Sequence, residues 1–138
     1  EIVPGVTAAS AAAAALGRPL TERGATSRLV LATAVAAGGS GTRDLADALT
    51  PGTTLAVYMG ARRLADLRAE MIARGLPGGT EIEIVSAAST GAEQVLRATL
   101  ATLPADATVP APAVILLRHP RHAAAQQATP RPAVAAVA

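Results

Sequence analysis

Cysteine, lysine, phenylalanine and tryptophan are all absent from this sequence of 138 residues, and Tyr58 is its only aromatic residue. Without cysteine, disulfide bonds and thiolate chemistry are excluded. Without Phe or Trp, the core must form from Val, Leu and Ile side chains that pack closely against alanine-rich helices. Because 51% of the residues are hydrophobic, a chain of this length can nevertheless bury the core of one folded domain.

The number and distribution of the charged residues do not indicate a nucleic-acid partner. Every basic side chain is an arginine, the net charge is only +2, and the arginines are scattered rather than clustered in a stripe. No apolar run approaches membrane-spanning length, and no secretory pattern opens the chain. The pair His119 and His122 is a weak metal signal within a segment that contains Pro and Arg. We therefore expect a cytoplasmic protein with no nucleic-acid partner, no membrane partner and no metal.

The stretch from Thr54 to Gly60 organises the chain. It follows the turn signal Pro51-Gly52, and its residues 55–59 carry no charge, which predicts a central strand covered on both faces. Residues 61–74 then repeat apolar side chains at helical spacing. In open α/β sheets, ligands bind outside the carboxyl ends of strands, so the Tyr58-Met59-Gly60 corner is the first candidate site. The alternative is that Met59 is simply the last core residue of the strand.

Other segments complete an α/β domain. No Ser-His-Asp, Cys-His or paired-carboxylate constellation can be assembled from them, and the glycines of 38–41 lack the spacing of a phosphate loop. The type of residues 93–100 stays open between a strand and a strand that passes into a short helix. We expect a helix over 8–16 between a Thr7 cap and Gly17, a strand over 28–35, a helix over 43–49, strands over 81–85 (with one wet face) and 113–117, and a weakly structured Pro/Ala/Arg tail over 119–138.

Several motifs, in order and at compatible spacing, resemble the second half of the uroporphyrinogen-III C-methyltransferases of the tetrapyrrole methylase superfamily. The motifs are Glu1–Ser10 with its Pro-Gly-Val-Thr-Ala turn, Gly17–Thr21, Thr54–Gly60 with Tyr-Met-Gly, Arg74–Pro77 and Pro112–Leu117. The resemblance covers residues 1–118 and implies one domain with a single mixed sheet and flanking helices. The chain opens at Glu1 in what looks like the end of a strand, so we expect a further segment before it.

The resemblance also implies a reaction and a site. The reaction is methyl transfer from S-adenosylmethionine to two pyrrole carbons of uroporphyrinogen III, which gives precorrin-2 on the route to sirohaem and cobalamin. The resemblance further implies a homodimer. By position in the motifs, the residues that contact the methyl donor are Thr7, Ala8, Met59 and Ala88.

The substrate carries a ring of carboxylates, and arginine is the residue that binds carboxylates in paired hydrogen bonds. Arg18, Arg23 and Arg28 are the candidates, because they lie between the donor-contacting turn and the next strand. Arg23 is favoured because it matches the arginine of the Thr-His-Arg pattern of the family. The alternative is that all three are solvated surface arginines.

The sequence also departs from the family. Thr21-Glu22-Arg23 replaces Thr-His-Arg, Ser86–Ser89 replaces Glu-Asn-Gly-Thr, and the last strand ends in Arg118 instead of glycine. The first half of the family, with its glycine-rich turn and Gly-Gly-Asp motif, is not in this chain. Three interpretations stay open: part of an active enzyme, a divergent enzyme with another substrate, or a non-catalytic dimerisation or regulatory domain.

Overall fold

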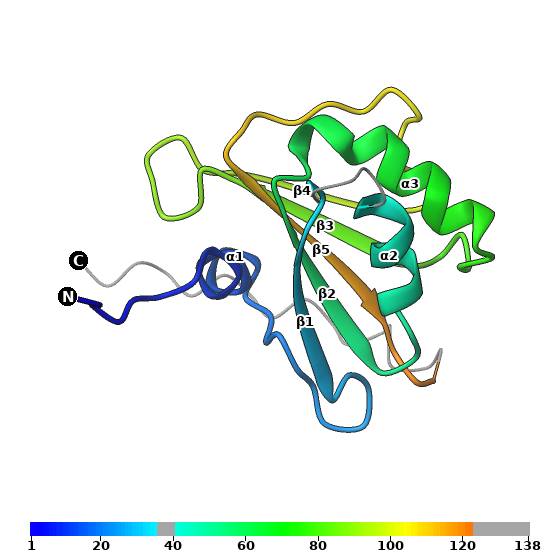
Figure 1. Ribbon diagram of the computed structural model, residues 1–138, viewed down its shortest axis with the longest axis horizontal. Helices are drawn as coiled ribbons and strands as arrows, with labels where there is room; N and C mark the ends of the chain where they lie inside the picture. The colour runs from blue at the N-terminus through cyan, green and yellow to red at the C-terminus, as the bar shows by residue number, and fades with distance from the viewer. Residues whose placement is uncertain (36–40, 123–138) are drawn as a thin grey trace.

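A computed structural model describes residues 1–35 and 41–122, which form one five-stranded mixed sheet with helices on both faces (Figure 1). The strand order is β1-β2-β5-β3-β4. β1, β2 and β3 run in one direction, and β4 and β5 run in the other. This confirms the predicted fold class. The strands are β1 (Arg28–Thr33), β2 (Thr53–Tyr58), β3 (Glu81–Ser86), β4 (Gln94–Thr99) and β5 (Ala113–His119).

The two faces of the sheet are covered by different helices, with α1 on one side and α2 and α3 on the other (Figure 1). Successive strand residues point to opposite faces, so Ala56 of β2 packs on the α1 side while Leu55 and Val57 pack on the α2–α3 side. The helical elements are α1 (Ala8–Leu16), α2 (Gly41–Ala48), the 3-10 turn η1 (Ala61–Arg63) and α3 (Leu64–Ala73).

Helix α1 has the predicted bounds, which its local sequence explains. The Thr7 side chain accepts a hydrogen bond from the Ala9 N–H, and Gly17 ends the helix in the left-handed region at φ 64°. Between these caps lie seven alanines, Ser10 and one leucine, and alanine and leucine are strong helix formers. Of its buried residues, Ala9 and Ala12 carry only methyl groups and Leu16 supplies one larger apolar side chain, and all three pack against the sheet.

Strand β3 corrects one prediction. Residues 81–85 were expected to have one face in water, but Ile82–Ser86 are all buried and Glu83 is only 2% exposed. The face that carries Glu83 lies under α1 and the segment after it, where arginines neutralise the carboxylate.

The other boundaries differ little from those expected. β2 is an interior strand with 0% exposure over 55–57, as predicted, but β5 is the middle strand of the sheet. The undecided segment 93–100 is the edge strand β4, and β1 ends at Thr33. β5 extends to His119; the predicted loop 38–40 and residues 123–138 of the predicted tail lie outside the described residues. Within the described part of the chain, each helix is too short or too polar to cross a membrane.

Candidate functional site

The carboxyl ends of β1, β2 and β3 lie at one edge of the sheet, because these three strands are parallel to one another. Among the connections that leave this edge are the Tyr58-Met59-Gly60 corner after β2 and the loop of residues 87–93 after β3. The amino end of α1 reaches the same edge (Figure 1). This is the place where an α/β sheet binds ligands.

Tyr58 joins the end of β2 to the start of α1. Its hydroxyl oxygen lies 2.6 Å from Thr7 Oγ1. The Ala9 N–H donates to both oxygens, at 3.1 Å to Thr7 Oγ1 and 3.0 Å to Tyr58 Oη. These bonds satisfy an N–H group that the first turn of a helix otherwise leaves unpaired. The sequence placed Tyr58 in the candidate corner but did not predict this role; the signal was that the only aromatic residue directly precedes Met59.

Met59 is a surface residue in a strained conformation. Its side chain is 62% exposed, and its φ is +54°, in the left-handed region that costs a non-glycine residue about 1–3 kcal/mol. The alternative interpretation of Met59 as a core residue is therefore wrong. A Cβ on the next residue, Gly60, would lie 2.7 Å from Cδ1 of the buried Ile115 in β5, so any side chain there would require Ile115 to shift. The corner thus turns tightly over the sheet and leaves the Met59 side chain free.

The loop after β3 is also strained and is held by its own hydrogen bonds. Ala87 and Ser89 have φ values of +49° and +62°. The Ser89 N–H donates to Glu93 Oε2 at 2.7 Å, which fixes the loop around Ala88. Ala88 is half-buried and packs on the α1 side of the core, in the same cluster as Tyr58.

The structure therefore brings together the four residues predicted to contact a methyl donor. Thr7 and Ala8 start α1, Met59 follows β2, and Ala88 follows β3, all at one edge. Three non-glycine residues with positive φ gather at the same edge, and such strain clusters at ligand sites. Ala8 and Ala88 carry only methyl groups, so a ligand can approach the backbone closely at both positions.

The predicted substrate arginines lie elsewhere. Arg18 is held on the α1 side by Glu81 at 2.8 Å and by Glu83 at 3.3 Å. Burial alone lowers the pKa of Arg18, but its hydrogen bond to Glu81 and the charges of both carboxylates outweigh burial and raise that pKa above its ordinary value. Its Nη1 group is thus already bound by two carboxylates of β3.

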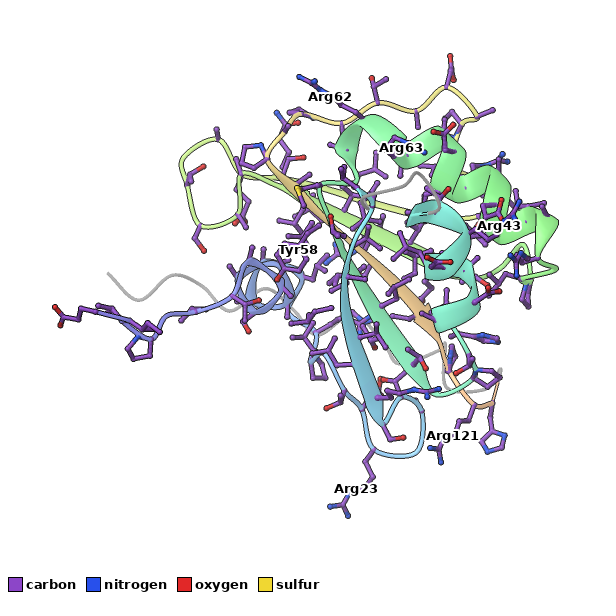
Figure 2. The ribbon with its side chains drawn as sticks, viewed as in Figure 1. Arg23, Arg43, Tyr58, Arg62, Arg63 and Arg121 are labelled. Atoms are coloured by element: carbon purple, nitrogen blue, oxygen red, sulfur yellow. The ribbon has the colours of Figure 1, made fainter. Side chains whose placement is uncertain are left out.

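Arg28 and Arg23 lie near the amino end of β1, at the opposite edge of the sheet. Arg28 donates to Thr53 Oγ1 at 3.0 Å and also to Thr50. Arg23 is exposed on the turn that the Glu22–Thr26 bridge closes, far from Tyr58 in Figure 2. The six residues of β1 separate the two edges by roughly 20 Å. The structure does not bring Arg23 to the other predicted site residues, and its role in substrate binding stays a prediction.

A buried ionic cluster that the sequence did not predict surrounds Glu83. Arg118 Nε lies 3.1 Å from Glu83 Oε2, and the two side chains are 4% and 3% exposed. Arg97 Nε approaches Glu83 Oε1 at 3.4 Å, and Arg118 also donates to the Pro19 carbonyl at 2.8 Å. The cluster ties the segment after α1 to the sheet. Two features of the sequence could have indicated this cluster. Glu83 lies within one largely apolar strand, and Arg118 directly follows the apolar residues of another strand.

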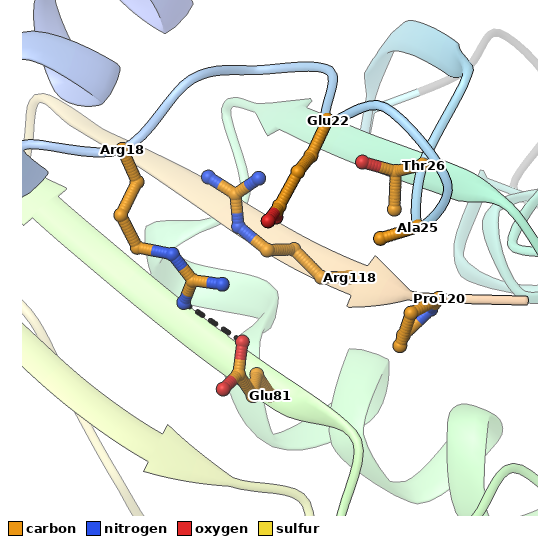
Figure 3. A pocket seen from close by; sticks show the side chains of 7 residues that line it. All are labelled: Arg18, Glu22, Ala25, Thr26, Glu81, Arg118 and Pro120. Carbon is orange, nitrogen blue, oxygen red and sulfur yellow. Dashed lines mark hydrogen bonds and ion pairs between the residues drawn. The ribbon is translucent and has the colours of Figure 1, made fainter. Parts of the chain in front are cut away.

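A small cavity beside this cluster is too small for a cofactor (Figure 3). Within the described part of the chain, Arg118 Nη2 and Thr26 Oγ1 are buried without a hydrogen-bond partner, and both residues line the cavity. Its volume of about 10 Å³ suits a single water molecule that bonds these groups. Among residues 1–35 and 41–122, no group of three or more His, Cys, Asp and Glu side chains could hold a metal ion.

The chain is similar to known proteins over most of its length. The sequence model of the family of tetrapyrrole (corrin/porphyrin) methylases matches residues 1–104 of this chain. A uroporphyrinogen-III C-methyltransferase of Paracoccus denitrificans is 39% identical over 123 residues, which are 86% of this chain and 43% of that protein. A sirohaem synthase of Nitrosospira multiformis is 41% identical over 104 residues, or 75% of this chain and 22% of that protein. The chain thus spans less than half the length of these two relatives.

Solved structures of methyltransferases have a similar fold. The uroporphyrin-III C-methyltransferase of Thermus thermophilus, complexed with S-adenosyl homocysteine, superposes with a TM-score of 0.68 at 32% identity. The match covers 86% of this chain and 52% of that one. A cobalt precorrin-4 methyltransferase superposes with a TM-score of 0.66 at 26% identity, over 86% of this chain and 51% of that one.

Proposed function

Because the chain belongs to the tetrapyrrole methylase family, we propose that it is the C-terminal part of an S-adenosylmethionine-dependent uroporphyrinogen-III C-methyltransferase. The product would be precorrin-2, the precursor of sirohaem and cobalamin. The observation that carries the proposal is the Thr7–Tyr58 hydrogen bond, which brings the start of α1 to the strained Met59 corner. We also propose, on the family resemblance alone, that the full protein is a cytoplasmic homodimer.

The proposed reaction needs alignment more than acid–base chemistry. S-adenosylmethionine would supply an electrophilic methyl group on its sulfonium. The electron-rich pyrrole carbon of the substrate would bond to this methyl carbon as the carbon–sulfur bond breaks, S-adenosyl homocysteine would leave, and the methylated pyrrole would lose a proton. The protein must hold that carbon and the methyl group in line, and such positioning can lower a barrier by several kcal/mol, about 7–11 in favourable cases. An edge without a catalytic dyad is compatible with this chemistry.

Four residues of this chain would hold the donor. The exposed Met59 side chain offers an apolar, polarisable surface to its adenosine or sulfonium portion. Ala8 and Ala88 leave room for the donor against the backbone. Thr7 would offer its hydroxyl, which Tyr58 holds in place at 2.6 Å. Two strained connections held by hydrogen bonds make this edge rigid before the donor arrives, which lowers the entropy cost of binding.

The test uses the full-length protein that contains this chain. Incubation with uroporphyrinogen III and methyl-labelled S-adenosylmethionine should transfer label to the tetrapyrrole and release S-adenosyl homocysteine. Binding of S-adenosyl homocysteine is measured in parallel by calorimetry. Donor binding with transfer only to another tetrapyrrole would indicate the divergent enzyme. Absence of both binding and transfer would leave the non-catalytic dimerisation or regulatory domain.

A further inference from the structure

Nearly all arginines of the described chain are already engaged. Every arginine within residues 1–35 and 41–122 except Arg23 and Arg62 has a hydrogen-bond or ion-pair partner. Arg63, for example, is held by Asp66 at 2.8 Å. A guanidinium group that already has a partner keeps some of its five N–H donors, but its orientation is set by that partner, so an arginine without one is freer to turn toward a ligand carboxylate.

The two unengaged arginines lie at opposite edges of the sheet. Arg23 precedes β1 at the amino edge, whereas Arg62 lies in η1, three residues after Met59, at the carboxyl edge. Figure 2 shows the Arg62 side chain directed away from the body of the protein. The turn that carries it is anchored by the Arg63 N–H bond to the Gly60 carbonyl at 2.9 Å. The strained corner therefore fixes the backbone position of Arg62, while its side chain stays exposed.

We propose that Arg62 binds a carboxylate of the ligands that meet at this edge and so helps to determine specificity. The proposal rests on the proposed function. Two carboxylates have the required chemistry: a side chain of the tetrapyrrole and the amino-acid end of the methyl donor. In either case the planar guanidinium group forms paired hydrogen bonds with the carboxylate. The neighbouring Arg63 is less free to turn toward a ligand, because its Nε donates to Asp66.

The experiment compares two matched variants of the full-length protein, Arg62→Gln and Arg23→Gln. Both residues are exposed and without a partner in the described chain, so neither change should alter the thermal midpoint. Arg62→Gln should raise the KM for the tetrapyrrole, or the Kd for the donor, by about tenfold or more, as expected for one charge-assisted pair. The same constant should become less sensitive to salt. Arg62→Lys keeps the positive charge but lacks the planar guanidinium group that forms paired hydrogen bonds, so it should lose less affinity than Arg62→Gln.

The outcomes separate the sources of the carboxylate. A change in the tetrapyrrole KM alone assigns it to the tetrapyrrole, and a change in donor Kd alone assigns it to the donor. If Arg62→Gln matches the parent in both constants at every salt concentration, or if only Arg23→Gln changes them, the proposal is wrong although the parent is active. A parent that neither binds donor nor transfers methyl groups refutes the proposed function itself, and this inference with it.

Discussion

The hydroxyl oxygen of Tyr58 lies 2.6 Å from Thr7 Oγ1, although 51 residues separate the two in the chain. The Ala9 N–H donates to both oxygens. The first turn of α1 and the last residue of β2 therefore behave as one unit. A change at either residue should affect the geometry of the other, and with it the edge that we propose to hold the methyl donor.

Tyr58→Phe tests this relationship. The variant keeps the ring and removes the hydroxyl group, while Thr7 still caps the helix. We expect a loss of about 1 kcal/mol in the free energy of unfolding, because hydrogen bonds to one hydroxyl group are lost. In the full-length protein, donor affinity should fall as well. Denaturant titration of this chain and calorimetry of the parent measure the two effects. Unchanged values in both would show that the bond positions nothing.

The two methionines provide a matched pair. Met59 is 62% exposed at the candidate edge, and Met71 is fully buried in α3. Met59→Leu should change the free energy of unfolding by no more than about 0.5 kcal/mol and weaken donor binding. Met71→Leu should cost up to about 1.5 kcal/mol and leave donor binding unchanged. Denaturant titration and donor calorimetry on both variants measure this. Equal donor affinities for the two variants would remove Met59 from the site.

Glu83→Gln should be among the most damaging single changes in this chain. It removes the buried carboxylate that neutralises Arg118, and an unpaired buried charge costs about 3–5 kcal/mol. Glu81→Gln is the control, because Glu81 is partly exposed and, among the described residues, forms its ion pair with Arg18 alone, so its loss should cost about 1 kcal/mol or less. The double variant Glu83→Gln, Arg118→Met should recover much of the loss, because it removes the orphaned charge. If denaturant titration gives equal losses for Glu83→Gln and Glu81→Gln, the cluster is not the main anchor of this face.

The isolated chain should bind S-adenosylmethionine weakly or not at all. The residues described here form one edge, and the resemblance implies a donor cleft between two domains, of which this chain would supply one wall. Calorimetry of the isolated chain beside the full-length protein measures the difference. Submicromolar binding by the chain alone would show that the donor site is complete within it.

Local sequence alone determined the elements whose signals are contained within a few residues. The helix over 8–16 was predicted with its bounds because Thr7, the alanines and Gly17 act on the backbone next to them. The buried strand before Met59 was predicted because a short uncharged run after the Pro51-Gly52 turn is typical of a strand that is covered on both faces. The candidate site residues came from motif resemblance, and the parallel direction of β2 and β3 then placed them at one edge.

Other properties depend on residues that are distant in the chain, and only the tertiary structure decided them. Glu83 is buried because Arg118, 35 residues later, neutralises it across the sheet, so its alternating strand pattern falsely indicated a wet face. Tyr58 reaches Thr7 only after β2 and α1 have packed together. The order of residues in the chain did not show which arginine lies at the edge of the candidate site. Arg23 follows α1 in the chain but lies at the opposite edge, whereas Arg62 follows Met59. Periodicity reports the local environment of a residue, whereas pairing across a sheet depends on the order and direction of its strands.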